Sequence, residues 1–253
     1  MYNFFVKKQN RNGNFFIISD SDYNHIKNVL RMKLGDTLLI SCDSKSHLCE
    51  IKSFENDVVI AEILEENYFD TSLTVDLYLF QGLPKSDKME FIIQKAVELG
   101  VKEIIPTEME HCVVKLEQKK KEAKRTRWQS ISESAAKQSK RNEVPQVTAV
   151  LSLKEALEKA RALDAVLVPY ENAKGMAATK EALQSLRAGM SVGIFIGPEG
   201  GFSEAEIEEI KGIGASAISL GKRILRTETA AIASLSMCML YAETELNDDN
   251  ASK

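Results

Sequence analysis

From about residue 73 onward, short apolar segments alternate with longer segments of helical periodicity. The apolar segments cover residues 73–80, 101–105, 165–168, 192–196 and 217–220. The first helical segment, residues 88–99, places Met89, Ile92, Ile93 and Ala96 on one face, and Gly100 follows as a C-terminal stop. Strands that alternate with amphipathic helices form parallel sheets covered by helices. The sequence therefore predicts an α/β domain, with further helices over residues 153–163, 176–186 and 203–213.

The first seventy residues follow a different pattern. Residues 15–18, 37–42, 47–54 and 58–64 have the composition of short strands, and one helix is expected over residues 21–29 with Asp20 or Ser21 as its N-cap. We therefore expect a small β-rich domain over residues 1–70 and a larger α/β domain over residues 73–245. Residues 246–253 are polar and are expected to form a frayed tail.

Two glycine-rich loops follow strands of the larger domain. Residues 192–196 lead into Gly197-Pro198-Glu199-Gly200-Gly201, and about twenty residues later comes the loop 220–226, Leu-Gly-Lys-Arg-Ile-Leu-Arg. Glycine permits positive φ and lets the backbone approach a ligand closely. A phosphate loop would continue with Gly-Lys-Ser/Thr, and a dinucleotide loop would read Gly-x-Gly-x-x-Gly; neither spacing occurs here. The loops therefore indicate a ligand held mainly through backbone contacts.

In this order, the two loops resemble the cofactor-binding loops of the SPOUT superfamily of methyltransferases, and within it those of the RsmE family. The resemblance extends over nearly the whole chain and includes His25, residues 29–31, 35–36, 88–101, Cys112, residues 115–116, Trp128, Gln138, Arg141 and Pro145. It implies a methyl transfer from S-adenosylmethionine to N3 of a uridine in 16S ribosomal RNA.

The resemblance also implies a structure. It implies an N-terminal PUA-like β-barrel that binds RNA, a C-terminal SPOUT-type parallel sheet with a deep trefoil knot, and a homodimer in which the last helix packs against a second subunit. The alternation of strands and helices alone does not distinguish a knotted sheet from a conventional doubly wound one. The apolar composition of residues 230–241 suits a buried or dimeric helix.

The same resemblance implies the residues of a cofactor site. They lie at the ends of three strands, in the two glycine-rich loops and at the start of the last helix. The expected cofactor-binding residues are Val168, Ile196, Gly197, Gly200, Gly201, Leu220, Gly221, Ile224, Leu225, Thr227, Thr229 and Ala230. The loop after Val168, residues 168–171, is also expected to border this site.

The reaction restricts the catalytic candidates. The nucleophile is the deprotonated imide of uracil, so a fixed cation near it would favour the reactive anion. Arg226 in the second loop is the candidate for this role, with a structural ion pair to Glu199 or Glu228 as the alternative. Glu199 and Glu228 are the candidate general bases, although Glu199 could instead accept backbone amides and Glu228 could cap the last helix. Placement of the methyl group alone could also suffice, without a base.

Charge is distributed unevenly along the chain. Residues 115–141 carry ten basic and three acidic side chains, a net +7 in a chain whose total is −4. Trp128, Ile131 and Ala135 recur at helical spacing there, which would fix the direction of a basic face suited to phosphates. The candidate RNA-binding residues, each of which could also be an ordinary surface charge, are Arg31, Lys85, Lys88, Lys115, Arg127, Lys137 and Arg141.

Composition excludes several other classes. The four cysteines form no Cys-x-x-Cys pair and the three histidines form no cluster, so we expect reduced thiols and no metal. No signal pattern or membrane-length apolar run is present, which predicts a cytoplasmic protein. The alternatives that remain are a SPOUT methyltransferase for a tRNA base or ribose and a non-catalytic rRNA-binding assembly factor. A nucleotide-dependent oxidoreductase is disfavoured by the missing fingerprint.

Overall fold

The protein is described by a computed structural model that covers residues 1–170 and 175–247. Glu171 of the predicted loop after Val168, and the tail from residue 248 onward, lie outside the described residues. The chain divides into two compact units: residues 1–72 with residues 136–144, and residues 73–135 with the chain from residue 145 onward. The sequence did not indicate that residues 136–144 group with the N-terminal unit.

The first unit is a six-stranded sheet with the order β1-β4-β5-β6-β3-β2. β1 pairs with β4 in parallel, and the other pairs are antiparallel. Buried and exposed side chains alternate along β3 and β6, as expected for strands with one face on a core. The strands are β1 (Asn3–Phe5), β2 (Arg11–Asn12), β3 (Phe15–Ile18), β4 (Thr37–Cys42), β5 (Lys45–Glu55) and β6 (Val58–Glu66).

Short helical segments complete this unit. Lys8–Asn10 forms a single 3₁₀ turn (η1), and α1 (Asp20–Asn24) continues as a π-helical turn over His25–Val29 (η2). The N-cap of α1 is Ser19, so the predicted caps, Asp20 and Ser21, were wrong by one and two residues. Ile26 is fully buried and anchors the helical segment on the core around Phe4, Phe16 and Ile40.

The second unit is a seven-stranded sheet in which every pair is parallel. Its order is β10-β8-β7-β12-β11-β13, and β9 also pairs with β8. The predicted parallel α/β sheet is thus confirmed. The strands are β7 (Asp76–Gly82), β8 (Val101–Glu108), β9 (Gln146–Val147), β10 (Leu151–Ser152), β11 (Ala165–Pro169), β12 (Ser191–Ile196) and β13 (Ser216–Ile218).

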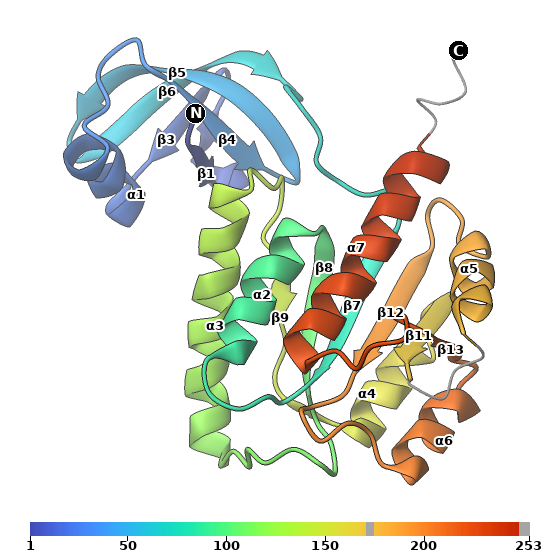
Figure 1. Ribbon diagram of the computed structural model, residues 1–253. Coiled ribbons are helices and arrows are strands. Elements are labelled where there is room, and N and C mark those ends of the chain that lie inside the picture. Colours follow the sequence, from blue (N-terminus) through green and yellow to red (C-terminus); the bar gives the residue numbers. More distant parts are fainter. Residues whose placement is uncertain (171–174, 248–253) are drawn as a thin grey trace. The chain divides into compact units, whose positions relative to one another are not determined.

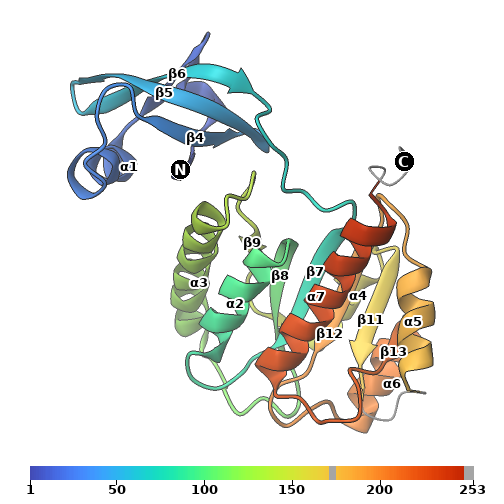
Figure 2. The same ribbon diagram turned by 45° about the horizontal axis from the view of Figure 1, so that its top comes forward.

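Two helices of the second unit begin at capping boxes that the sequence supplies. Ser152 and Glu155 form a capping box at α4, and Ser203 and Glu206 form another at α6. The helices are α2 (Lys88–Glu98), α3 (Gln118–Gln138), α4 (Leu153–Ala160), α5 (Met176–Gln184), α6 (Glu204–Gly212) and α7 (Thr227–Glu245). α2 and α7 lie side by side (Figures 1 and 2), with α7 in contact with β7 and β12. On α3, Trp128 and Ala135 are buried and Ile131 is half-buried, as the helical spacing predicted.

The register of the sheet brings four loops to one edge. Ile196 at the end of β12 pairs with Gln81 near the end of β7, so the loops that follow these strands begin side by side. Pro169 at the end of β11 likewise pairs with Ile218 at the end of β13. Ligands of parallel α/β sheets bind outside the carboxyl ends of the strands. This edge is therefore where a site is expected. Among the described residues, no helix has the length and apolar character needed to span a bilayer.

Candidate functional site

A cleft of about 900 Å³ opens at this edge of the second unit. Its walls are the two glycine-rich loops, the ends of β11 and β12, and the first turn of α7. Most of the predicted cofactor-binding residues line it: Ile196, Gly197, Gly200, Gly201, Leu220, Gly221, Ile224, Leu225, Thr227 and Ala230. Val168 is fully buried in β11 and Thr229 is exposed on α7, and neither belongs to the lining.

The first loop depends on close approaches that only glycine allows. A Cβ on Gly82 would lie 2.7 Å from both the backbone nitrogen and the Cδ atom of Pro198. A Cβ on Gly200 would lie 2.8 Å from Cβ of His111, whose Nδ1 is 3.1 Å from the Gly200 carbonyl oxygen. The loop therefore packs against the segments that follow β7 and β8. Its shape is fixed by these neighbours.

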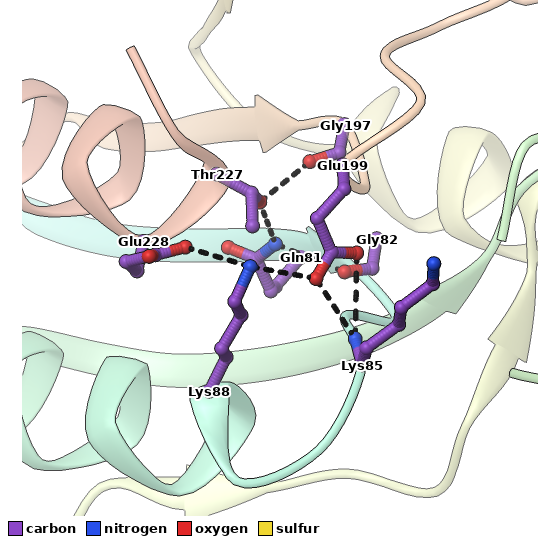
Figure 3. Close-up of polar contacts among 8 residues, drawn as sticks. All are labelled: Gln81, Gly82, Lys85, Lys88, Gly197, Glu199, Thr227 and Glu228. Atoms are coloured by element: carbon purple, nitrogen blue, oxygen red, sulfur yellow. Dashed lines mark hydrogen bonds and ion pairs between the residues drawn. The ribbon is translucent and has the colours of Figure 1, made fainter. Parts of the chain in front are cut away.

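A buried hydroxyl connects the first loop to β7 and α7. Thr227 Oγ1 donates to the carbonyl of Gly197 at 2.7 Å and accepts from Nε2 of Gln81 at 2.9 Å (Figure 3). Gln81 is fully buried, and its Nε2 also donates to the Gly82 carbonyl at 2.9 Å. Sequence reasoning missed Gln81. The signal that could have found it is one polar residue near the end of the apolar run 77–83.

Lys88 lies between the two candidate carboxylates. Its Nζ is 2.9 Å from Oε1 of Glu199 and 3.6 Å from Oε2 of Glu228 (Figure 3). Glu199 also accepts the backbone N–H of Lys85, at 3.1 and 3.3 Å to its two oxygens. Lys88 is thus held by two carboxylates, one from the first glycine-rich loop and one from the first turn of α7.

The protonation of this group follows from these contacts. Burial alone would raise the pKa of Glu199, but the hydrogen bond from Lys88 and those from backbone amides outweigh it and hold the pKa below its usual value. The hydrogen bond to Glu199 raises the pKa of Lys88. Glu199 and Lys88 are therefore charged at neutral pH, and Glu199 holds the loop as its structural alternative predicted.

Arg226 occupies the rim of the cleft at the N-cap position of α7. Its side chain is exposed, and within residues 1–170 and 175–247 it forms no hydrogen bond or ion pair. The alternative ion pair from Arg226 to Glu199 or Glu228 is not formed among the described residues, where Lys88 pairs with both carboxylates. The alternative role of Glu228 as a cap of α7 is not seen either, because no side-chain cap hydrogen bond forms at this helix among the described residues. Glu228 lies in the first turn, where a carboxylate is favourable to the helix dipole.

Some candidate RNA-binding residues of the second unit are exposed, and others are held by carboxylates. Lys85 and Lys115 are exposed, whereas Lys88 is ion-paired as described. Arg127 is exposed but forms two hydrogen bonds with Glu90, at 2.6 and 2.8 Å. The hydrogen bond from Arg127 lowers the pKa of the Glu90 carboxyl.

In the first unit, the candidates also separate into free and engaged side chains. Arg31 is exposed and has a positive φ of 54°. Lys137 pairs with Asp22 at 2.9 Å, and its Nζ lies 6.0 Å from the centre of the Phe4 ring. Arg141 is buried, and burial lowers the pKa of its guanidinium. Its backbone carbonyl accepts from Asn3 and Ser41. These contacts favour structural roles for Lys137 and Arg141.

The cysteines are buried free thiols. Burial raises the pKa of Cys49 and of Cys238 to about 12. Thiols of this kind are not nucleophiles at neutral pH, because the reactive form is the thiolate. Among the described residues, no group of three or more His, Cys, Asp or Glu side chains could hold a metal ion.

Comparison with known proteins decides the family. Residues 71–239 match the RNA methyltransferase domain family, and residues 18–64 match the RNA methyltransferase PUA domain. The ribosomal RNA small subunit methyltransferase E of Bacillus subtilis is 39% identical over 94% of this chain and 94% of its own. The corresponding protein of Mesomycoplasma hyopneumoniae is 36% identical over 94% of this chain and 99% of its own. The chain belongs to the ribosomal RNA small subunit methyltransferase E family.

Solved structures of methyltransferases agree with this assignment. The small subunit methyltransferase E from Neisseria gonorrhoeae, bound to S-adenosyl methionine, matches with a TM-score of 0.79 and 31% identity over 95% of this chain and 97% of that chain. A putative methyltransferase from Legionella pneumophila, in complex with the same cofactor, matches with a TM-score of 0.80 and 30% identity over 94% and 96%. For this member of the methyltransferase E family, the PUA-like and SPOUT-type parts of the predicted fold are confirmed. The trefoil knot stays a prediction.

Proposed function

We propose that this member of the methyltransferase E family transfers a methyl group from S-adenosylmethionine to N3 of a uridine in 16S ribosomal RNA. The observation that carries the proposal is the cleft. Two glycine-rich loops line it, and the exposed side chain of Arg226 lies at its rim. The similarity to relatives of this name over 94% of the chain supports the target.

The lining of the cleft fits S-adenosylmethionine. Its volume of about 900 Å³ lies within the range of small-molecule sites. Gly201 and Gly221, with φ of +71° and +102°, face open space where a side chain would otherwise project. We propose that backbone groups of Gly197, Gly201, Leu220 and Leu225 bind the cofactor's polar edges, and that Ile196 packs against its adenine. Ile224 is 88% exposed and would be covered when the site is filled.

Arg226 would act on the uridine. When bound, S-adenosylmethionine supplies an activated methyl group, so the protein must favour the deprotonated imide of uracil. A fixed guanidinium near N3, O2 or O4 stabilises that anion, and each unit by which the pKa of the imide falls is worth about 1.4 kcal/mol. Arg226 suits this role because its charge is not neutralised by a partner in the described part of the chain.

Glu199 and Glu228 are poorly placed to be general bases. Both are bound by Lys88, and Glu199 also accepts the N–H of Lys85. The pKa of Glu199 is held below its usual value, which makes this carboxylate a weak base for a uracil imide. We propose that the two carboxylates fix the loops and that proton loss to solvent precedes methyl transfer. No dedicated base is then required.

The two domains would divide the work between RNA positioning and chemistry. We assign residues 1–70 to RNA binding and residues 73–245 to methyl transfer, in line with the PUA and methyltransferase matches. Arg31, Lys85 and Lys115 are the proposed phosphate contacts because they are exposed. Phosphate contacts of this kind give an affinity that falls with salt.

We propose a homodimer formed through α2 and α7. Leu240 on α7 is 57% exposed and Phe91 on α2 is 44% exposed, and these helices lie side by side. Large exposed apolar side chains on adjacent helices are typical of a surface that another chain covers. A second subunit would bury them.

Methyl transfer tests the proposed function directly. Purified small ribosomal subunits and naked 16S RNA are incubated with labelled S-adenosylmethionine, and the RNA is digested to nucleosides. Label in 3-methyluridine that Arg226→Ala abolishes, and that Lys154→Ala on the exposed face of α4 does not, would support the reaction and the role of Arg226. Label in another nucleoside would overturn the uridine assignment. An absence of S-adenosylmethionine binding would favour a non-catalytic assembly factor.

A further inference from the structure

The loop 222–226, between β13 and α7, carries three cations and no acidic side chain, in a chain whose total charge is −4. Lys222, Arg223 and Arg226 all line the cofactor cleft, and all three are exposed. Among the described residues, none of the three forms a hydrogen bond or an ion pair. Arg226 is assigned to the uridine above, which leaves Lys222 and Arg223 without a role.

The cofactor does not account for this positive charge. S-adenosylmethionine is a cation overall, because its sulfonium and ammonium groups outnumber its single carboxylate. One lysine or arginine could pair with that carboxylate, but further cations would repel the cofactor. In the described lining of the cleft, the carboxylate is that of Glu199, and Lys88 already pairs with it. The surplus of positive charge therefore suits the second ligand of the cleft, a polyanionic RNA.

Ile224 follows the two unassigned cations and also lines the cleft. It is the most exposed large apolar side chain in the described part of the chain, at 88%, against 65% for Val113, the next most exposed. Removal of apolar surface from water is favourable, so a ligand that covers Ile224 gains affinity. A nucleobase offers a flat apolar face once it leaves its stack.

The loop is fixed at both ends. Before it, the buried Thr179 of α5 donates through Oγ1 to the Ser219 carbonyl at 2.8 Å and accepts the Ser219 N–H at 2.9 Å. Oγ of Ser219 accepts the N–H of Gly221 at 3.2 Å. After the loop, Thr227 is bonded to Gly197. These anchors limit the conformations of the loop, which lowers the entropy lost when it binds a ligand.

The position of the reacting atom determines the form of the RNA at this loop. In a base pair, N3–H of uridine donates to the partner base, so a methyl group can reach N3 only when the uridine is unpaired. Proteins hold unpaired bases against side chains, while contacts to phosphates position the strand. Arg223 and Arg226 are three residues apart, so their Cα atoms are separated by at most about 11 Å. A phosphate bound to Arg223 therefore belongs to the target nucleotide or to a near neighbour.

We propose that residues 222–224 hold an unpaired RNA strand at the target uridine; this inference rests on the proposed function. Lys222 and Arg223 bind phosphates beside the uridine, and Ile224 packs against the face of a base that has left its stack. Arg226 then meets the uracil of a strand that is already in place. The second glycine-rich loop thus contacts both ligands, the cofactor through its backbone and the RNA through these side chains.

The salt dependence of RNA binding measures the phosphate contacts. A fluorescein-labelled oligouridylate nonamer is titrated with the full-length protein at several KCl concentrations, and Kd is obtained from the anisotropy. We expect Lys222→Ala and Arg223→Ala each to raise Kd and to lower the slope of log Kd against log salt by about 0.7, the value for one phosphate of a single strand. Wild-type slopes in both variants would overturn the phosphate contacts. A wild-type protein that does not bind the nonamer would overturn the proposal as a whole.

Arg161→Ala is the matched control. It removes an exposed cation at the C-cap of α4, outside the lining of the cleft. We expect its Kd and its slope to equal those of the wild type. A slope lowered as much as in Arg223→Ala would show that the charge acts through the overall field of the protein, and would refute a specific contact.

Ile224→Ala tests the apolar contact, because it removes apolar surface and leaves the charge unchanged. We expect Kd for the nonamer to rise roughly 10-fold, with the salt slope of the wild type. A wild-type Kd would refute the contact with a base.

The affinity for S-adenosylmethionine, measured by titration calorimetry, separates the two ligands. We expect the cofactor to bind Lys222→Ala and Arg223→Ala at least as tightly as it binds the wild type. A loss of cofactor affinity as large as the loss of RNA affinity, in any of the three loop variants, would assign that residue to the cofactor and overturn its role in RNA binding. Variants that all methylate 16S RNA with the KM of the wild type would contradict this inference alone. A wild-type protein that binds no S-adenosylmethionine would contradict the proposed function itself.

Discussion

The hydroxyl of Thr227 provides a direct test of how the cofactor cleft is held together. Thr227→Val keeps the shape of the side chain and removes the bond to Gly197 at 2.7 Å and the bond from Gln81 at 2.9 Å. Thr227 is nearly buried and Gln81 is fully buried, so water cannot replace the bond between them. The substitution therefore isolates the connection between β7, the first glycine-rich loop and α7.

The expected loss of stability follows from these contacts. A neutral hydrogen bond contributes about 0.5–1.5 kcal/mol, and a buried group left unpaired costs about 1–3 kcal/mol. Gln81 keeps its bond to the Gly82 carbonyl, and Gly197 borders the cleft, so neither partner loses all its bonds. We expect the free energy of unfolding to fall by about 2 kcal/mol, which lowers Tm by about 4–8 °C for a unit of this size.

Cofactor affinity should fall as well. The hydrogen bond from Thr227 to Gly197 acts as a tether for the first glycine-rich loop. Without this tether, about one loop residue must be ordered when the cofactor binds, at a cost of about 1–2 kcal/mol, so the Kd for S-adenosylmethionine should rise about tenfold. Scanning calorimetry and titration calorimetry measure the two effects. Ser132→Ala is the control, because it removes one buried hydrogen bond, of 2.7 Å to Pro145, from α3 outside the cleft. It should lower Tm without changing the Kd. A Thr227→Val protein with lower Tm and unchanged Kd would refute the tether as a determinant of binding.

Three further predictions concern the loops and the helices. Gly82→Ala should destabilise the protein by about 1–3 kcal/mol because its Cβ meets the Pro198 backbone at 2.7 Å, whereas Gly212→Ala in α6 has free space and should be neutral or stabilising in urea unfolding. Because the pKa of Glu199 is lowered in the folded protein, its ion pair stabilises the protein above a pH of about 4.3, and this stabilisation is lost as the pH falls through the folded pKa. Glu199→Gln should therefore make Tm fall less steeply at acid pH. An unchanged dependence of Tm on pH would contradict the ion pair. Leu240→Glu should convert a dimer to a monomer in light scattering while Met176→Glu, similarly exposed on α5, should not; a monomeric wild type would reject the dimer.

Much of the fold could be predicted because its signals are local. The apolar runs and helical periodicities after residue 73 identified the main strands and helices. The predicted ends of strands were less accurate where pairing with a neighbouring strand extended a strand past the point at which its own sequence suggested it would stop. β8 was expected to stop at Ile105, but it continues through Pro106 to Glu108 because Pro106 pairs with Gln81 in the parallel register. The two-residue strands β2, β9 and β10 are too short for any periodicity to reveal.

The candidate site also has parts that could be predicted from local sequence and parts that could not. The glycine-rich loops could be found because their composition is itself the signal, and the cleft contains most of the residues expected in it. The role of Lys88 could not be found, because its partners Glu199 and Glu228 are more than a hundred residues away along the chain. The register of β7 and β12 brings Glu199 near Lys88, and the packing of α7 beside α2 brings Glu228 there. A lysine at the start of a helix resembles a surface charge until its partners are known.

Lys88 also explains why Arg226 remains available, which leads to a final prediction. Lys88→Met would leave Glu199 and Glu228 without their cation, and Arg226, two residues from Glu228, would then be the cation available to them. A neutralised Arg226 stabilises the uracil anion less, so kcat should fall, by about tenfold for each unit by which the pKa of the imide rises. Adding Glu199→Gln and Glu228→Gln removes the competing carboxylates and should restore part of the lost kcat. If the triple variant is no faster than Lys88→Met, Lys88 contributes to the reaction directly, and the two carboxylates are not what keeps Arg226 free.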